Sequence, residues 1–491
     1  MSLDRRQLFR RGGAAGAGLV VASTGVGSPA GAAGRSVSDR RSGPRLFPPL
    51  VDGDLLALPP GFSYRVVAQA GVTMMEDGSP TPDHQDGLRA LVWGRGYRLM
   101  QNHEARPGSV QPVPLTPGTI YDEGVIGGGC TVIDVTRQGE RVSEWVGLSG
   151  TLSNCSGGAT PWGSWLSCEE SELTAGTLVG SATLQQDHGY VFEVFPNDAS
   201  EQSPQPIRAW GRAPHEAVVL EPSRTRAYLT EDASTPSGLL YRWTAPTGYR
   251  LRPHIADSLG ADAGGLEALA LLAPDGSVLP DLAYVTSAQI GRPFTATWKT
   301  VPDRHATTTS LRSQFEDAAI TRGKKLEGAW GTERGMYFTS SFAAAADVPT
   351  NATPHDGQLW WYEFRDQTLT LVAYFPYNAL LHQAPAGWEQ SLGVSLDLAF
   401  DGPDNVHVSP YGSLILAEDG VTANHTLAWS PRYGAQAIVR NRIVRAQNPS
   451  GGNAYGEMTG PCFSPDGRIL FVSVQVPGYT FAISGPWARY L

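Results

Sequence analysis

Long apolar runs are almost absent from this sequence, and basic residues are fewer than acidic ones. From about residue 45 onward, no stretch approaches the roughly 20 apolar residues that a membrane-spanning helix requires. We therefore expect one soluble domain over residues 34–491, without membrane association. The 37 Lys and Arg against 47 Asp and Glu give a formal net charge of −10, which argues against nucleic acid as a partner.

Long amphipathic helical patterns are also few, whereas proline and glycine are frequent, with 37 and 57 residues respectively. This composition is typical of many short strands joined by turns. All-β chains of this length can still form one domain. The sequence therefore predicts an all-β fold.

The main apolar run lies at the N-terminus. Arg5-Arg6 precede a run rich in Ala, Gly and Val, Gly12–Gly27, which ends near Ala30-Gly31-Ala32. This pattern is typical of a twin-arginine signal peptide over residues 1–33, and the run is too short and too rich in glycine to span a bilayer. We expect the twin-arginine machinery to export the folded protein to the periplasm, the cell envelope or the medium.

Cysteine is scarce, with only Cys130, Cys155, Cys168 and Cys462 in the whole chain. A protein that folds in a reducing cytoplasm before export is a poor candidate for a disulfide framework. Cys130 and Cys462 lie in apolar settings, and we expect them to be buried as small hydrophobic side chains. Cys155 and Cys168 instead flank a Gly/Pro/Trp turn that ends in Glu169-Glu170.

Six segments share one layout: a ligand-type residue, a short strand-like run, a turn and a second strand-like run. They begin at Asp86, Cys155, Glu216, Glu327, Asp404 and Glu457. Repeated antiparallel units at intervals of tens of residues indicate a six-bladed β-propeller. The longest interval, between Glu216 and Glu327, indicates an insertion within about residues 244–323.

In a propeller, the innermost strand of each blade lines the central channel, so the same register means the same level around the axis. We therefore expect all six ligand-type residues at the channel mouth. A ring of buried carboxylates repels itself unless cations neutralise it. Oxygen ligands suit calcium, and a single thiolate suits a transition metal such as iron. Each acid alone could instead be a solvated turn residue or a helix cap.

The segment Asn154–Glu170 resembles the signature of the PhoX-type alkaline phosphatases, which are exported metallophosphatases on a β-propeller. The signature has the form Asn-Cys-Ala/Ser-Gly-Gly-x-Thr-Pro-Trp-Gly-x-Trp-Leu-x-Cys-Glu-Glu. The resemblance spans about residues 45–488, and further pieces occur in the family's order: Asn102-His103-Glu104, His215-Glu216, Leu326-Glu327-Gly328, Pro403-Asp404-Asn405, Glu418-Asp419-Gly420, Phe463–Gly467 and Gly478–Trp487.

The resemblance implies a site with two iron ions (Fe³⁺) and calcium ions (Ca²⁺) joined through a bridging oxide. Cys155 resembles the iron thiolate, Glu216, Glu327 and Asp404 resemble carboxylate ligands, and Glu170 resembles a further acid of the cluster. A metal-bound oxide or hydroxide would then attack the phosphorus of a phosphomonoester at alkaline pH, without a protein nucleophile.

One position departs from the family's pattern. PhoX enzymes carry a phosphate-gripping arginine two residues before the glutamate that matches Glu327, and this chain has Lys325 there. Lysine keeps the charge but loses the bidentate fork, so Arg322 is a second candidate for phosphate binding. We place Asn154, the first residue of the signature, with these two as catalytic candidates.

Four other histidines have no ligand-like spacing, and we expect them to be exposed: His188, His254, His305 and His425. The predicted protein is a monomer that acts on small phosphate esters. Two other functions stay open at this point. One is a calcium-dependent propeller hydrolase of phosphodiesters, phosphotriesters or lactones, and the other is a propeller that binds a partner without catalysis.

Overall fold

The structure is a computed structural model that describes residues 45–180, 182–343, 356–376, 397, 400–420, 423–444 and 455–491. The chain divides after residue 43 into two units, and all described residues belong to the second. The predicted signal peptide, residues 1–33, therefore lies outside the described residues. Among the described residues, no helix has the length and apolar character needed to cross a membrane.

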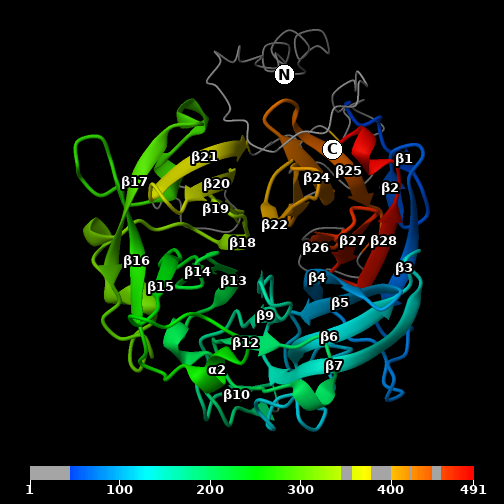
Figure 1. The fold of residues 1–491 in the computed structure, drawn as a ribbon, viewed down its shortest axis with the longest axis horizontal. Helices are drawn as coiled ribbons and strands as arrows, with labels where there is room; N and C mark the ends of the chain where they lie inside the picture. Colours follow the sequence, from blue (N-terminus) through cyan, green and yellow to red (C-terminus); the bar gives the residue numbers. More distant parts are fainter. Residues whose placement is uncertain are drawn as a thin grey trace, which may run out of the picture. The chain divides into compact units, whose positions relative to one another are not determined.

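The second unit is an all-β fold whose antiparallel sheets surround a central axis in a propeller-like arrangement (Figure 1). This confirms the predicted all-β, propeller-like fold. The helices among the described residues are short: η1 (Ala199–Glu201), η2 (Arg208–Trp210), α2 (Ile255–Ser258), η3 (Leu282–Tyr284), η4 (Ser287–Gln289), η5 (Leu311–Gln314), η6 (Asp317–Ala319) and η8 (Trp487–Arg489).

Two sheets run from the axis outward through consecutive strands. The first contains β4 (Gln85–Trp93), β5 (Gly96–His103), β6 (Gly128–Val135) and β7 (Arg141–Thr151). The second contains β8 (Gly158–Ala159), β9 (Trp165–Cys168) and β12 (Val191–Val194). A separate hairpin is formed by β10 (Leu178–Val179) and β11 (Ala182–Thr183).

The largest sheet has nine strands, with one strand beside the axis at each of its two edges. Its first four strands are β13 (His215–Leu220), β14 (Arg226–Glu231), β15 (Leu240–Thr244) and β16 (Gly265–Leu272). It continues through β17 (Pro293–Thr300), β21 (Thr368–Phe375), β20 (Gly357–Glu363), β19 (Gly335–Ser340) and β18 (Leu326–Gly331). The predicted insertion, residues 244–323, thus supplies β16 and β17, which join the two halves of this sheet.

Residues from both ends of the chain complete the last two sheets. The six-stranded sheet contains β22 (Pro403–Val408), β23 (Leu414–Glu418), β24 (His425–Ser430), β25 (Gly434–Asn441), β2 (Leu56–Leu58) and β1 (Val51–Asp52). The four-stranded sheet contains β26 (Met458–Phe463), β27 (Ile469–Val474), β28 (Tyr479–Ser484) and β3 (Ser63–Gln69). Pairing β3 with β28 closes the ring non-covalently.

The repeated glycine explains the common layout of the sequence segments. Gly94, Gly163 and Gly412 each stand eight residues after a ligand-type residue, in the turn between a first and a second strand, with φ of 54°, 99° and 91°. Only glycine adopts such angles without steric cost. The turn therefore fixes where the second strand starts relative to the first.

The apolar core lies between neighbouring sheets and within the large one. Tyr228 stacks at 5.2 Å from both Tyr362 and Phe364, which ties β14 to the other half of the nine-stranded sheet. Cys130 and Cys462 are buried in this apolar material, as predicted, and all four cysteines are free thiols. At one end of the inner strands, buried polar side chains including Asp86, Glu216 and Glu327 gather beside the axis.

Candidate metal centre

A β-bulge at the same end of four inner strands positions an acidic residue in each. The pairing register shifts between Gln85 and Leu88 in β4, His215 and Val218 in β13, Leu326 and Ala329 in β18, and Pro403 and Val406 in β22. The first residue inside each bulge is a predicted ligand: Asp86, Glu216, Glu327 and Asp404, respectively. Bulges re-aim side chains out of the strand's regular alternation.

In β4 and β18 the second bulge residue is a glycine, because neighbouring strands approach closely there. A Cβ atom on Gly87 would lie 1.7 Å from the carbonyl oxygen of Ser156, and one on Gly328 would lie 2.7 Å from the Cα atom of Asn405. The glycines that follow Asp86 and Glu327 thus allow adjacent sheets to meet at the axis.

Cys155 occupies the matching place in the sheet of β8 and β9. Its N–H donates to the carbonyl of Cys168 at 3.0 Å, and its Sγ lies 3.5 Å from Glu170 Oε2. Asn154 does not point its amide at the acids: its Oδ1 accepts from Thr151 Oγ1 at 2.6 Å and its Nδ2 donates to Ser167 Oγ at 2.9 Å. Asn154 therefore holds the turn that presents Cys155.

The prediction that Glu457 shares this register is wrong. The bulge in β26 lies between Thr459 and Cys462, so its first residue is Gly460, and Glu457 precedes the strand. A carboxylate oxygen of Glu457 nevertheless lies near those of Asp404 and Asp419, with all three within 4.8 Å of one another. Glu457 reaches the acidic cluster from outside the repeat.

The second strands contribute a further set of acids, of which only Glu170 is among the ligands predicted from the sequence. Glu104, Glu170, Asp232 and Asp419 each follow the end of a second strand or the residue after it. In three cases the preceding residue is a buried glutamate, Glu169, Glu231 or Glu418. Because successive strand residues face opposite ways, one acid of each pair faces the sheet interior and the next faces the axis. These four acids can be found from the sequence, because each follows the second strand-like run of a repeated segment.

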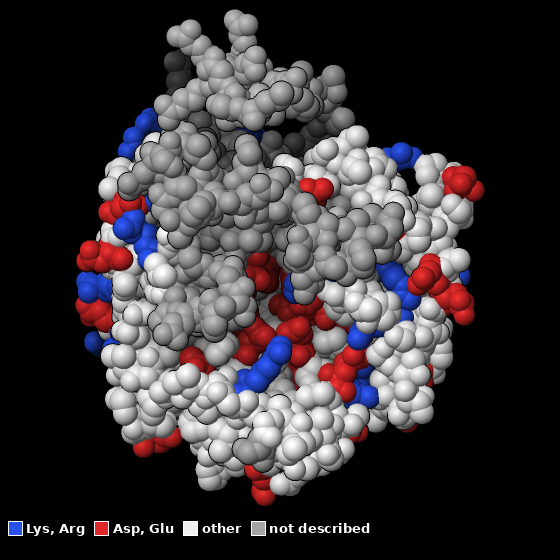
Figure 2. All heavy atoms as spheres, turned by 180° about the vertical axis from the view of Figure 1, so that it is seen from behind, with Lys and Arg blue, Asp and Glu red and all other residues white. Residues whose placement is uncertain are grey.

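Three groups of side chains place donor atoms close enough to share a cation. They are Asp86, Glu104 and Cys155; Glu216, Glu327 and Asp404; and Asp404, Asp419 and Glu457, and within each group the atoms lie within 4.8 Å of one another. Figure 2 shows acidic side chains gathered in a hollow of the molecule. Glu170 joins through Cys155 rather than through one of these groups.

The carboxylates of the cluster outnumber the basic side chains that could neutralise them, and this shifts their pKa values. Burial, followed by neighbouring carboxylates, raises the pKa of Asp86, Glu216 and Asp404 well above the usual range, and it raises the pKa of Glu327 to about 7. The same causes raise the pKa of the Cys155 thiol. Asp86 Oδ1 is buried and has no hydrogen-bond partner among the described residues. Carboxylates and one thiol with these properties fit polyvalent cations.

Comparison with known proteins assigns the family. The sequence matches the alkaline phosphatase PhoX family over residues 46–145 and 138–478. The chain belongs to the PhoX family. The structure of Pseudomonas fluorescens PhoX in complex with vanadate, a transition-state analogue, superposes with a TM-score of 0.61 at 17% identity, over 90% of this chain and 99% of that one.

More distant solved structures include a periplasmic gluconolactonase of Pseudomonas aeruginosa, at 14% identity and a TM-score of 0.35, over 84% of this chain and 89% of that one. The PQQ domain of a pyranose dehydrogenase from Coprinopsis cinerea gives 10% identity and a TM-score of 0.38, over 87% and 97% of the two chains. No curated protein matches the sequence. The family match makes this protein a PhoX-like alkaline phosphatase.

The three basic residues nearest to this chemistry lie in different environments in this PhoX protein. Lys325 forms ion pairs with Asp232 and with Glu327 Oε1, the latter at 3.0 Å, so it lies inside the cluster. The described contacts of Arg322 are with Asp317 and with backbone carbonyls, which leaves it outside the cluster. Arg106, absent from the sequence-based candidates, pairs with both Glu104 and Glu170.

Two of the histidines predicted to be exposed are fully buried. His188 lies between Glu169, at 2.6 Å, and Asp122, at 3.3 Å. His425 lies in the same way between Glu418, at 2.8 Å, and Asp397, at 3.2 Å. Both histidines anchor the inward-facing glutamate of an acid pair. The residue after each glutamate, Glu170 or Asp419, is thereby held toward the axis.

Hydrogen bonds from neighbouring strands end on the backbone carbonyls of three candidate ligand residues. Two of them join different sheets: Asn102 Nδ2 donates to the carbonyl of Cys155 at 2.6 Å, and Thr339 Oγ1 donates to that of Asp404. The third joins the two halves of the nine-stranded sheet, where Thr230 Oγ1 donates to the carbonyl of Glu327 at 2.8 Å. The positions of these residues therefore depend on contacts around the ring.

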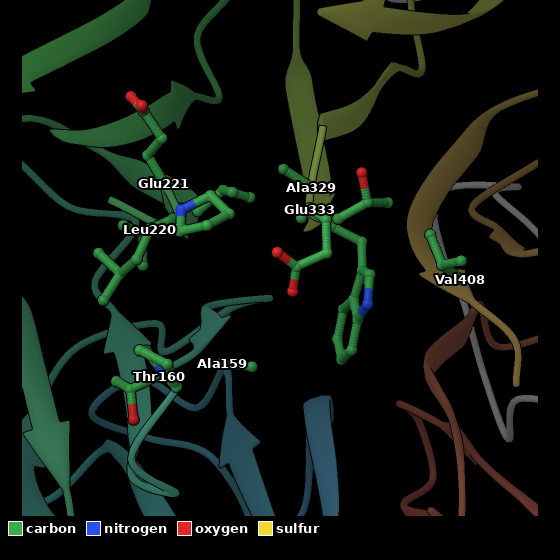
Figure 3. Close-up of a pocket in the computed structure, with 14 residues that line it drawn as sticks. Ala159, Thr160, Leu220, Glu221, Ala329, Glu333 and Val408 are labelled. Atoms are coloured by element: carbon green, nitrogen blue, oxygen red, sulfur yellow. The ribbon is translucent and has the colours of Figure 1, made fainter. Parts of the chain in front are cut away.

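The opposite ends of the inner strands line a separate cavity of about 580 Å³ (Figure 3). Its walls mix apolar residues, such as Ala159, Leu220, Ala329 and Val408, with the acids Glu221 and Glu333. None of the cluster residues lines it. The chemistry of the site is therefore confined to the bulged end of the channel.

Proposed function

We propose that this PhoX-like alkaline phosphatase hydrolyses small phosphate monoesters at a metal centre at the mouth of the central channel. The observation that carries this proposal is the set of three adjoining donor groups built from one thiol and seven carboxylates. Burial and mutual repulsion raise the pKa of Asp86, Glu216 and Asp404, and cations bound among these carboxylates would relieve that repulsion.

The donor types suggest how the metals divide. Cys155 would bind iron, with Asp86 and Glu104, because a soft thiolate selects a transition metal. Glu216, Glu327 and Asp404, and then Asp404, Asp419 and Glu457, offer only oxygen and suit further metal ions, including calcium. Bound metal ions supply Lewis acidity to the phosphoryl group and lower the pKa of a coordinated water.

The remaining residues bind and orient the ester. Lys325 presents a cation between two carboxylates, and metal binding to those carboxylates would free its ammonium for a phosphate oxygen. In the reaction a bond forms between a water-derived oxygen and phosphorus, the bond from phosphorus to the alcohol oxygen breaks, and the alcohol leaves with the proton. Asn154 acts through Cys155, whose position it fixes.

We also propose that the sheets form a six-bladed propeller. The nine-stranded sheet has two inner strands, β13 and β18, and would represent two blades joined at their outer strands through β16 and β17. Export by the twin-arginine route and a monomeric state stay proposals supported by the N-terminal sequence and the family. A folded metal centre acquired before export would suit that route.

Metal content and colour test the centre. Protein purified from the exported pool should contain iron and calcium, and thiolate-to-iron charge transfer should give it a visible absorption band. Cys155→Ser should lose that band and most phosphatase activity. The matched control is Cys462→Ser, because Cys462 Sγ accepts from Ala90 N at 3.3 Å and a hydroxyl can do the same. A full-strength band in Cys155→Ser would contradict the ligand assignment.

A substrate panel tests the reaction class. We expect hydrolysis of phenyl phosphate at alkaline pH, and far slower turnover of bis-phenyl phosphate, a phosphotriester and a lactone. Faster turnover of the diester than of the monoester would favour the alternative hydrolase. Metal binding without turnover of any of the four compounds would favour a binding protein.

A further inference from the structure

A cavity of about 360 Å³ adjoins the acidic cluster on the side of Glu170. Arg106, Ser153 and Glu170 form its inner wall, so it is continuous with the proposed catalytic centre. Its other walls include Leu152, Leu173, Val179, Pro107 and Pro214. The volume lies at the lower end of the roughly 300–1,000 Å³ that small-molecule sites occupy, which suits a small group.

Arg106 is the cation at the border between this cavity and the cluster. Its Nε donates to Ser153 Oγ at 2.7 Å, while its Nη2 lies 3.3 Å from Glu104 Oε1 and 3.6 Å from Glu170 Oε2. The side chain is 61% exposed, so part of the guanidinium faces solvent. The guanidinium is thus oriented by one good hydrogen bond and keeps donors for a ligand.

The two ion pairs of Arg106 are long, and both involve acids beside Cys155. When cations bind to Glu104 and Glu170, those carboxylates turn their charge toward the metals, and the guanidinium gains an unbalanced positive charge. Phosphate is the ligand that a guanidinium fork matches in geometry and charge. Lys325, on the other side of Glu170, supplies a single point charge by comparison.

The cavity wall also carries negative charge. Glu170 and Glu172 both line it, and Glu172 is held there by Arg312 at 2.7 Å. An alcohol with its own carboxylate or phosphate would meet these acids at close range in a site with apolar walls, which is unfavourable. A small alcohol without negative charge would avoid this repulsion and could pack against Leu152, Leu173 and Val179.

We propose that Arg106 grips the phosphate of the substrate and that the adjoining cavity receives its alcohol group, so that the enzyme selects monoesters of small apolar alcohols over monoesters of anionic alcohols. This inference rests on the proposed phosphatase function and specifies its substrate class.

The first experiment compares phenyl phosphate with 4-carboxyphenyl phosphate, a pair that differs by one carboxylate. We expect kcat/KM to be at least ten-fold higher for phenyl phosphate in the parent enzyme. Leu173→Trp should fill the cavity and lower kcat/KM for phenyl phosphate at least five-fold, while the inhibition constant of inorganic phosphate stays unchanged. The matched control is Val110→Trp, at an exposed position outside the cavity. Equal use of both esters, or no effect of Leu173→Trp, would overturn the alcohol site.

The second experiment measures binding of inorganic phosphate by titration calorimetry in metal-loaded protein. Arg106→Ala should weaken binding at least ten-fold, and Arg106→Lys should restore part of the loss. Arg334→Ala is the control, since that arginine is also exposed and pairs with Glu363 at 3.3 Å. Unchanged phosphate affinity in Arg106→Ala, with metal content intact, would overturn the role of Arg106.

These measurements separate this inference from the function on which it rests. A parent enzyme that hydrolyses neither ester would overturn the proposed function, and the calorimetry would then decide Arg106 alone. A parent that hydrolyses phenyl phosphate but shows none of the expected differences would leave the function standing and overturn this inference.

Discussion

At the scale of single residues, the site depends on the environment of each side chain more than on its type. Glu169 and Glu170 are adjacent and identical in chemistry, yet Glu169 accepts from Gly189 N at 2.8 Å and from His188, whereas Glu170 faces Cys155 and Arg106. Alternation along the strand assigns the first to structure and the second to the metal cluster.

Lys325 is the residue at which this chain leaves the family's pattern, and its position allows a direct prediction. Burial lowers its pKa, but Asp232 and Glu327 outweigh that effect and raise it, so the ammonium stays charged at alkaline pH. Lys325→Ala should lower kcat/KM about ten-fold or more, which corresponds to about 1.4 kcal/mol of transition-state stabilisation. Lys325→Arg should retain or improve activity, since its fork engages two oxygens.

Steady-state kinetics with phenyl phosphate, with metal content measured in each variant, checks this prediction. Arg322→Ala is an informative comparison because its described contacts lie outside the cluster. A fully active Lys325→Ala variant with intact metals would show that the ammonium only balances Asp232 and Glu327.

At the scale of elements, the bulged inner strand is the unit that makes the site. The bulge turns one acid toward the axis, and a small residue beside it lets the next sheet approach. Gly87 shows the tightest approach, where a Cβ atom would lie 1.7 Å from a backbone oxygen of the neighbouring sheet. A backbone atom cannot move aside to relieve such a clash as the end of a flexible side chain can.

Gly87→Ala should therefore separate β4 from the Cys155 segment. We expect a loss of at least 1–3 kcal/mol of stability, the range typical of overpacking, together with loss of bound iron. Urea unfolding and elemental analysis measure the two effects. Gly265→Ala is the matched control, because a Cβ atom there would meet nothing within 4 Å. If both variants keep the stability and metal content of the parent, the close approach does not hold the ligands.

The contact between β22 and β26 carries a pH-dependent element. His407 Nε2 accepts from Phe463 N at 3.2 Å, and burial alone lowers the pKa of His407 to about 3. The folded state thus holds a neutral imidazole, whereas the unfolded chain binds a proton below about pH 6.5. Stability from this group is complete above pH 6.5 and is lost as the pH falls toward 3.

When the pH is lowered from 7 to 5, protonation of His407 in the unfolded chain should lower the free energy of unfolding of the parent protein by about 2 kcal/mol. His407→Gln offers an acceptor for Phe463 N and does not titrate, so it should lose correspondingly less over that range. Urea unfolding of both proteins with saturating calcium measures the difference. Parallel pH profiles for the two proteins would contradict a buried neutral histidine.

At the scale of the whole molecule, the proposed metal centre draws on several sheets of the ring. Its candidate ligands are spread between residues 86 and 457, and β3 and β28 close the ring. Metal ions bound there stabilise the folded state, since the unfolded chain cannot assemble the site. Without them, the carboxylates must take up protons or repel one another.

Removal of the metals should therefore lower the unfolding temperature of the whole domain and abolish activity together. A ligand at 100 times its Kd contributes about 2.7 kcal/mol, so the shift should be measurable by calorimetry. Chelation followed by calcium and iron in turn would show which ion restores stability and which restores turnover. An unchanged midpoint after complete metal removal would mean that the acids are stable as a protonated cluster.

The sequence by itself determined the all-β class, the family and most of the acids that gather in the candidate metal centre. Turn glycines at fixed spacing, such as Gly94 and Gly412, are a local requirement for positive φ, and they report the repeat directly. The signature around Cys155 and the acids Asp86, Glu216, Glu327 and Asp404 could be found because each lies in the same local context. Structural requirements that involve only neighbouring residues in the chain can be recognised from the sequence.

Only the tertiary structure decided which acid of each pair faces the axis, that Glu457 stands outside the shared register, and that His188 and His425 are buried. It also placed Arg106 in the cluster and Arg322 outside it, although Arg322 is nearer to Glu327 in the sequence. These outcomes depend on strand pairing and on contacts between residues far apart in the chain. The spacing of residues in the sequence does not show which of them lie close together in the ring, because the partners come from segments that are far apart in the chain.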